Sequence, residues 1–368
     1  RLAPAGDVNG DGFDDLIVSA RYGDDGGSDA GEAYVIFGAS SSFGAGDGTG
    51  RRVIDLTFLT PDQGFIIQGD SSGDQLNFVM AAGDVNGDGF DDLIVGAPWG
   101  DDGGIDAGEA YVVFGTASGF GVVHGTGRRV IDLTSLLPAQ GFIIQGDVAG
   151  DQASWAASSA GDVNGDGFDD LVVGARYGDD GGTNAGDAYV VFGGASGFGA
   201  LDSSGRRVID LTSLTAAQGF IIQGDVAGDA LGASASSAGD INGDGYDDLI
   251  VGANLGDDGG TDAGEAYVIF GTSGGFGAVD GTGRTVIDVT YLSPSQGFII
   301  QGDTAGDRAG NSVAAAGDIN GDGYDDLIVN AGRGDDGGTD AGETYVIFGA
   351  SSGLGVVDGT GRRVMDLT

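Results

Sequence analysis

One 15-residue stretch, GDVNGDGFDDLIVGA at residues 83–97, recurs along the 368-residue chain at an almost constant interval. Its near-copies are marked by Asp7, Asp84, Asp162, Asp240 and Asp318, which are separated by 77, 78, 78 and 78 residues. A stretch that returns at a fixed period indicates a structural repeat rather than a set of unrelated domains. We therefore expect a single array of similar units, near residues 1–75, 76–152, 153–230, 231–308 and 309–368.

Each unit contains four segments with the length and composition of β-strands. In the second unit, residues 76–84 are rich in small residues, residues 92–97 and 109–115 are continuously apolar, and residues 141–147 read GFIIQGD. Continuous apolar runs are typical of strands that are covered on both faces. The polar insertion GRRVIDLT at 127–134 precedes the last strand and is compatible with either a short outer strand or a turn of helix.

Four antiparallel strands repeated at a fixed interval, with apolar faces on both sides, predict an all-β fold of the β-propeller type. About five four-stranded blades are then visible in this chain as one domain, 1–368. The small-residue strand suits the crowded innermost position of a blade. A parallel β-helix is also rich in glycine and aspartate, but its period is far shorter. Both chain ends fall inside a unit, so we expect a piece of a longer protein and of a larger propeller.

The charge of the chain excludes several classes of function. Its formal net charge is −43, which argues against nucleic acid or anionic membranes as partners. No apolar run reaches the ~18 residues that a membrane-spanning helix needs. The chain has no cysteine, no lysine and one histidine, so most nucleophile–base pairs cannot be built and we expect no enzymatic activity. Of the 57 acidic residues, 39 lie in two loops of each unit.

The first of these loops presents oxygen atoms at regular positions. In the second unit Asp84, Asn86 and Asp88 alternate, the carbonyl of Phe90 follows, and Asp92 closes the loop. Calcium accepts six to eight oxygen ligands and tolerates an irregular arrangement of them. The position of the bidentate glutamate of an EF-hand lies inside the next strand, so this loop joins two strands rather than two helices. The spacing predicts a calcium site.

The pattern D-x-[DN]-x-D-G-x-x-D directly before an apolar strand resembles the FG-GAP repeat of the integrin α-subunit propeller and its bacterial relatives. Phe-Gly follows the third strand in every unit, and Gly-Ala-Pro stands intact at 96–98. The resemblance implies a propeller with about one Ca²⁺ per repeat, between the first two strands, and no catalytic or other cofactor site. The implied ligands are Asp7, Asn9, Asp11, Phe13, Asp15, Asp84, Asn86, Asp88, Phe90, Asp92, Asp162, Asn164, Asp166, Phe168, Asp170, Asp240, Asn242, Asp244, Tyr246, Asp248, Asp318, Asn320, Asp322, Tyr324 and Asp326.

Loops of an up-and-down sheet alternate between its two ends. We therefore expect the first loops and the insertion on one side, and the acidic second loops (100–109 and copies) with residues 145–151 and copies on the other. We expect this second side to contact a protein or carbohydrate ligand, or further divalent ions, and a solvated acidic face is the simpler alternative.

The resemblance implies a calcium-binding module for adhesion or recognition in a secreted or cell-surface (extracellular) protein. The alternative function is a non-catalytic scaffold or accessory module of a larger secreted enzyme.

Overall fold

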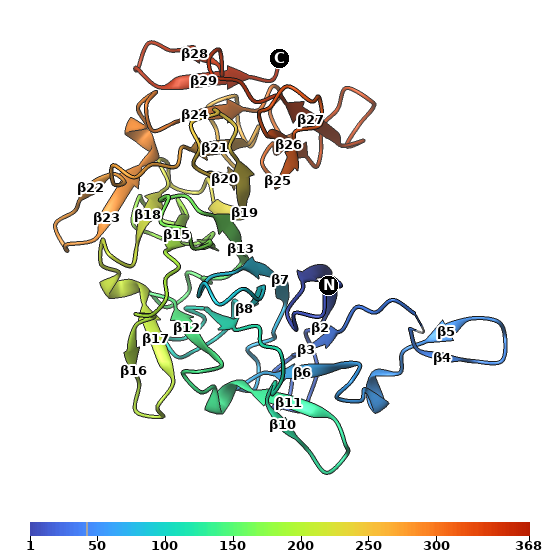
Figure 1. The fold of residues 1–368 in the computed structure, drawn as a ribbon. Coiled ribbons are helices and arrows are strands. Elements are labelled where there is room, and N and C mark those ends of the chain that lie inside the picture. Colours follow the sequence, from blue (N-terminus) through green and yellow to red (C-terminus); the bar gives the residue numbers. More distant parts are fainter. Residues whose placement is uncertain (42) are drawn as a thin grey trace.

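The computed structural model describes residues 1–41 and 43–368, and β-strands are its main regular elements (Figure 1). The helical elements of this part of the chain are four single 3-10 turns, η1 (Leu56–Phe58), η2 (Leu133–Ser135), η3 (Leu211–Ser213) and η4 (Val289–Tyr291). None of the described helices is long and apolar enough to cross a membrane. The expectation of an all-β fold is confirmed.

Each repeat builds one antiparallel sheet whose strands are ordered as in the sequence. In the second repeat β7 (Phe78–Gly83) pairs with β8 (Asp92–Ala97), β8 pairs with β9 (Glu109–Val113), and β9 pairs with β12 (Gly141–Gln145). These bounds lie within two residues of the four predicted segments.

The other repeats follow the same order. Their first strands are β1 (Leu2–Gly6), β13 (Ala156–Gly161), β19 (Leu231–Gly239) and β25 (Ser312–Gly317). Their second strands are β2 (Asp15–Ala20), β14 (Asp170–Ala175), β20 (Asp248–Ala253) and β26 (Asp326–Ala331). Their third strands are β3 (Glu32–Ile36), β15 (Asp187–Val191), β21 (Glu265–Ile269) and β27 (Glu343–Ile347). Their fourth strands are β6 (Gly64–Gln68), β18 (Gly219–Gln223) and β24 (Gly297–Gln301), and within the described residues the fifth sheet has three strands.

The insertion forms a hairpin that extends the sheet of the preceding repeat. The hairpin strands are β4 (Ala45–Gly46) with β5 (Arg52–Val53), β10 (Val122–Val123) with β11 (Arg129–Asp132), β16 (Ala200–Leu201) with β17 (Arg207–Asp210), β22 (Ala278–Val279) with β23 (Thr285–Asp288), and β28 (Val356–Val357) with β29 (Arg363–Asp366). The strand β11 lies parallel to β6, the outermost strand of the first repeat, and the next three hairpins repeat this pairing one sheet further along. Four sheets therefore have six strands, and β4–β5 forms a separate two-stranded sheet.

The insertion is thus both a strand and a turn of helix, because β11 continues directly into η2. The insertion was expected on the same side of the sheets as the first loops. This prediction is wrong for the residues that follow the hairpin turn, which contact the second-loop side. Thr134 donates to the Asp70 carbonyl at 3.4 Å, and Arg206 pairs with Asp102 at 2.6 Å; both partners lie on the second-loop side. The reason for Thr134 is the parallel pairing, because β11 runs along β6 toward the end of that strand from which Asp70 follows.

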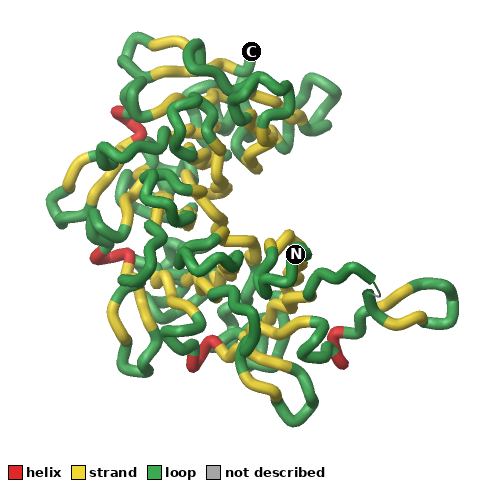
Figure 2. The backbone as a smooth tube through the Cα atoms, viewed as in Figure 1, coloured by secondary structure: helices red, strands yellow, loops and turns green. Residues whose placement is uncertain are grey.

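The sheets pack face to face in an arc, with their first strands along the inner edge (Figures 1 and 2). The strands β1, β7, β13, β19 and β25 contact one another in series. The apolar core lies between the sheets. Val95 on one face of β8 joins a cluster with the first sheet, whereas Ile94 on the other face joins a cluster with the third. All six residues of β8 are buried, as its continuous apolar run predicts.

A stack of three phenylalanines fixes three of the hairpins to the sheet before them. Phe198, in the loop that leads into β16, lies parallel to Phe142 of β12 with 4.4 Å between ring centroids. Phe114 contacts both rings at 5.5 and 5.9 Å, and it is the phenylalanine of the recurrent Phe-Gly pair. The counterpart of Phe198 in the first repeat is Phe43, which is 45% exposed.

We expect Phe198→Ala to lower the free energy of unfolding by about 3–5 kcal/mol, because it removes a buried ring and leaves a cavity between two repeats. Phe43→Ala is the matched control and should change stability little, since among the described residues its hairpin pairs with no other sheet. Urea unfolding followed by circular dichroism measures both variants. Equal losses of unfolding free energy in the two variants would contradict the role of the stack.

Candidate metal centres

The first loop of each repeat turns its own side-chain oxygens inward. In the second repeat the backbone N–H of Asp88 donates to both Asp84 Oδ1 (3.0 Å) and Asn86 Oδ1 (2.8 Å), so these two oxygens lie side by side. Gly89 donates to Asp84 Oδ2 at 2.9 Å, and Phe90 donates to Asp88 Oδ1 at 3.1 Å. The first, third and fifth positions are therefore gathered by one turn.

Two glycines allow the backbone to adopt this turn. Gly87 and Gly89 have φ angles of 73° and 89°, in the left-handed region that side chains with a Cβ disfavour. The same pair recurs in the other four first loops. The tight turn that gathers the side-chain oxygens therefore requires the two glycines as well as the aspartates.

The ninth position connects the first loop to the rest of its sheet. Asp92 is fully buried, its Oδ2 accepts from the Val85 N–H at 3.1 Å, and its Oδ1 accepts from the Gly115 N–H at 2.8 Å. Burial raises its pKa to about 8, which the two backbone donors partly oppose. A nearby cation would favour its charged form. The other ninth-position aspartates make the same two contacts: Asp15, Asp170, Asp248 and Asp326.

The eighth position has a role that the sequence analysis missed. Asp91 reaches back to the preceding repeat, where its Oδ2 accepts from the Asp7 N–H at 2.7 Å. The equivalent bonds to Asp169, Asp247 and Asp325 measure 2.7, 2.8 and 2.9 Å. The recurrent Asp-Asp pair was the available signal: one member stays in its own sheet, and the other holds the neighbouring loop.

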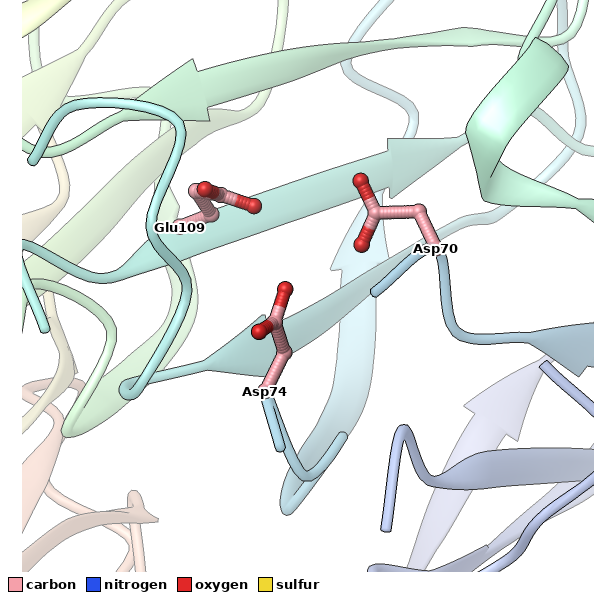
Figure 3. A group of neighbouring side chains, drawn as sticks. All are labelled: Asp70, Asp74 and Glu109. Atoms are coloured by element: carbon pink, nitrogen blue, oxygen red, sulfur yellow. The ribbon is translucent and has the colours of Figure 1, made fainter. Parts of the chain in front are cut away.

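A second set of carboxylates gathers on the other side of the sheets. Asp70 and Asp74, in the segment between β6 and β7, point toward Glu109 at the start of β9 (Figure 3). One oxygen of each lies within 4.8 Å of the others. We call this set and its copies the junction clusters: Asp70, Asp74 and Glu109; Asp225, Asp229 and Glu265; Asp303, Asp307 and Glu343. Among the described residues the first-loop carboxylates form no group that meets this distance.

Each junction cluster is built by a second loop folding onto the start of the third strand. Glu109 is buried, its Oε1 accepts from the Asp102 N–H at 2.6 Å, and its Oε2 accepts from the Tyr111 hydroxyl at 2.5 Å. The Gly146 N–H donates to the Gly108 carbonyl at 2.8 Å, which brings the second loop and the segment after β12 together. Their predicted location on one side is confirmed.

The clustered carboxylates are costly to ionise. Burial, reinforced by the charges of Glu109 and Asp70, raises the pKa of Asp74 to about 8. Burial likewise raises the pKa of Glu109 to about 7 and that of Glu265 to about 8. A neighbouring positive charge is the usual compensation for such a group.

An arginine from the insertion supplies part of that charge. Arg206, directly before β17, pairs with Asp102 at 2.6 Å, with Asp70 at 3.1 Å and with Asp202 of its own hairpin at 2.8 Å. Arg284 and Arg362 make the same three contacts one and two repeats further along. These arginines tie a hairpin to the acidic side of the preceding sheet.

The contact between first loops predicts a stability effect. Asp169→Ala should lower the free energy of unfolding by about 1–3 kcal/mol, because the half-buried Asp84 N–H loses its acceptor. The matched control is Asp14→Ala, since Asp14 holds the same position in the first repeat, is exposed, and accepts no hydrogen bond from another loop among the described residues. Thermal melting monitored by circular dichroism compares the two. A control variant as unstable as Asp169→Ala would contradict the contact.

The sequence and the fold agree with one known family. The FG-GAP repeat model matches residues 2–36, 77–113, 154–191, 232–269 and 309–347, about half of the chain. Integrin alpha-PS2 of Drosophila melanogaster is 30% identical over 197 residues, which cover 51% of this chain and 12% of that protein. Phosphatidylinositol-glycan-specific phospholipase D of Bos taurus is 31% identical over 192 residues, 52% of this chain and 20% of that protein.

Integrin alpha-5 of Xenopus laevis is 26% identical over 256 residues, 69% of this chain and 19% of that protein. The chain therefore spans a fifth or less of the length of these relatives. Each matched range contains one first loop, the strands on either side of it, and the following second loop. With the repeat model matching in all five units, this chain belongs to the FG-GAP repeat family.

Proposed function

We propose that this chain is a calcium-stabilised β-propeller segment that serves adhesion or recognition outside the cell. The observation that carries the proposal is the fivefold recurrence of inward-turned loop oxygens, each set closed by a buried aspartate. The five residues of each first loop that were predicted from the sequence are the ligands we propose, at about one Ca²⁺ per repeat. No part of the chain is assigned a catalytic role.

The donor set fits a hard cation. Side-chain oxygens and one carbonyl per loop supply oxygen ligands only, which calcium prefers. The negative groups of one loop repel each other, and a bound divalent ion removes that repulsion. The buried Asp92 adds to this, because burial disfavours its charged form and raises its pKa, and a bound cation would offset that effect. Binding to the folded state alone then stabilises the fold by mass action.

The arc of sheets is consistent with part of a propeller ring. Each sheet is apolar on both faces and packs against its neighbours, with the first strands lining the inner edge. We propose that these sheets are blades and that further blades complete the ring. A closed ring would cover the outer faces of the first and last sheets and leave few exposed edges.

Adhesion or recognition is the function we favour, with a protein or carbohydrate ligand on the second-loop side. Matches to integrin alpha chains support it, and the affinity typical of extracellular calcium modules, ~10⁻⁴–10⁻³ M, suits a secreted or cell-surface location. A second function is favoured by the match to a phospholipase D: a non-catalytic accessory module of a larger secreted enzyme.

Calcium removal tests the metal proposal. At free calcium 100-fold above the dissociation constant, each occupied loop contributes about 2.7 kcal/mol, so chelation should lower the melting temperature strongly. Asp88→Ala should reduce the rise in melting temperature that calcium produces. Asp62→Ala, at an exposed position outside both acidic loops, is the control and should leave that rise unchanged. Scanning calorimetry with calcium and with chelator measures all three chains, and identical melts of the unaltered chain in both conditions would contradict the proposal.

Binding assays test the recognition proposal. The immobilised chain should retain extracellular proteins or glycans from defined panels in calcium and lose them in chelator, because the ligand-binding loops depend on the ordered sheets. A variant that reverses charge at the exposed second-loop residue Asp336 should weaken retention without changing the melt. If the chain binds neither panel, the adhesion proposal loses its support. The second proposed function, a non-catalytic accessory module of a larger secreted enzyme, would then be favoured.

A further inference from the structure

The junction clusters contain buried carboxylates that accept no hydrogen bond from the residues the structure describes. Asp74 is 3% exposed, and among residues 1–41 and 43–368 no donor forms a hydrogen bond with its carboxylate. The same holds for Asp229 of the second cluster, which is also 3% exposed. Buried polar groups almost always have a partner, so an unpartnered one requires a specific explanation.

A second orphaned oxygen points to the same place. Asp70 uses Oδ2 to pair with Arg206, whereas its Oδ1 is buried without a partner. Asp303 Oδ1 is orphaned in the same way in the last cluster. Figure 3 shows the three carboxylates of the first cluster directed at one another. One oxygen of each of these three residues lies within 4.8 Å of the other two, so the carboxylates share one small space.

The charge balance of the cluster is incomplete. Asp70, Asp74, Glu109 and the adjoining Asp102 offer four carboxylates, and Arg206 brings one positive charge. Both oxygens of Glu109 already accept hydrogen bonds, but each retains a lone pair for a further contact. A hard divalent cation would satisfy the orphaned oxygens and reduce the excess negative charge.

We infer that each junction cluster binds a divalent cation of the calcium or magnesium type, separate from the first-loop sites. The ligands are the paired aspartates of one inter-repeat segment and the glutamate that begins the third strand of the next sheet. Because the aspartates follow the fourth strand of one repeat and the glutamate belongs to the next, the ion joins two consecutive repeats. The rival explanation is a proton on Asp74 in place of the ion.

The third sheet contains a natural control. There the glutamate is replaced by Asp187, whose side chain is one methylene shorter. Among the described residues Asp147, Asp151 and Asp187 do not come within the distance that defines the other clusters. Asp187 Oδ1 and the Tyr189 hydroxyl are both buried without a partner. The shorter side chain leaves the site unformed, so this repeat binds the second ion weakly or not at all.

Ion counting tests the inference on the full chain. Titration with calcium chloride alone, followed by calorimetry and native mass spectrometry, should give eight ions: five in the first loops and three in the junction clusters. Asp74→Asn, which keeps the shape of the side chain, should remove one ion. Asp187→Glu should add one, which a merely destabilising substitution cannot do. Far-UV circular dichroism confirms that both variants are folded.

The outcomes separate this site from the first-loop sites. Asp88→Asn should remove one first-loop ion, and Asp74→Asn should then still remove one ion from a junction cluster. If the first loops bind no calcium, the junction clusters alone should still give a count of three bound ions. Anomalous scattering from crystals soaked in manganese should place a peak between Asp74 and Glu109. A count that neither Asp74→Asn nor Asp187→Glu changes, with no peak at that point, overturns the inference in favour of the protonated carboxyl.

Discussion

Each sheet of this protein has two apolar faces, so a repeat can bury its surface only against neighbouring repeats. The strand β8 illustrates the constraint: Val95 packs into the core shared with the first sheet and Ile94 into the core shared with the third. A single repeat in water would leave one of these faces exposed, and burial of such faces is the main favourable contribution to folding. The contacts between repeats are therefore part of the fold itself.

Polar groups at the two sides of the sheets follow from that dependence. On the first-loop side, Asp91 accepts the Asp7 N–H of the preceding repeat, while the adjacent Asp92 stays within its own sheet. On the second-loop side, Arg206 crosses to the preceding sheet and meets Asp102 and Asp70. Aspartate is thus used in three ways: to gather the turn, to connect neighbouring loops, and to pair with an insertion arginine.

Concentrating carboxylates at these junctions has an electrostatic cost. Burial raises the pKa of Asp92 and Asp74 to about 8, because a desolvated negative charge is unfavourable. Backbone donors lessen the cost at Asp92, whereas Asp74 has no donor among the described residues. The proposed cations would act at both places for the same reason, and those of the junction clusters would bind where two repeats meet. Metal content and the order of the array would then be coupled.

The sequence alone determined the repeat, the four strands of each unit and the composition of the first loops. Apolar runs such as residues 92–97 are unambiguous when they return at a fixed period, and the alternation of Asp84, Asn86 and Asp88 predicts an oxygen-lined turn without further information. The sharing of sides by the second loops and the segments after the fourth strands also followed from strand alternation, and the Gly146–Gly108 hydrogen bond confirms it.

Only the tertiary structure decided where the insertion goes and which carboxylates meet. Sequence order places β11 within the second repeat, yet its partner is β6 of the first, because the exposed outer edge of that sheet offers unpaired backbone groups. Asp74 and Glu109 are 35 positions apart, and no local pattern relates them. These two residues come together because the faces of two sheets pack against each other. Their separation along the chain does not predict that contact.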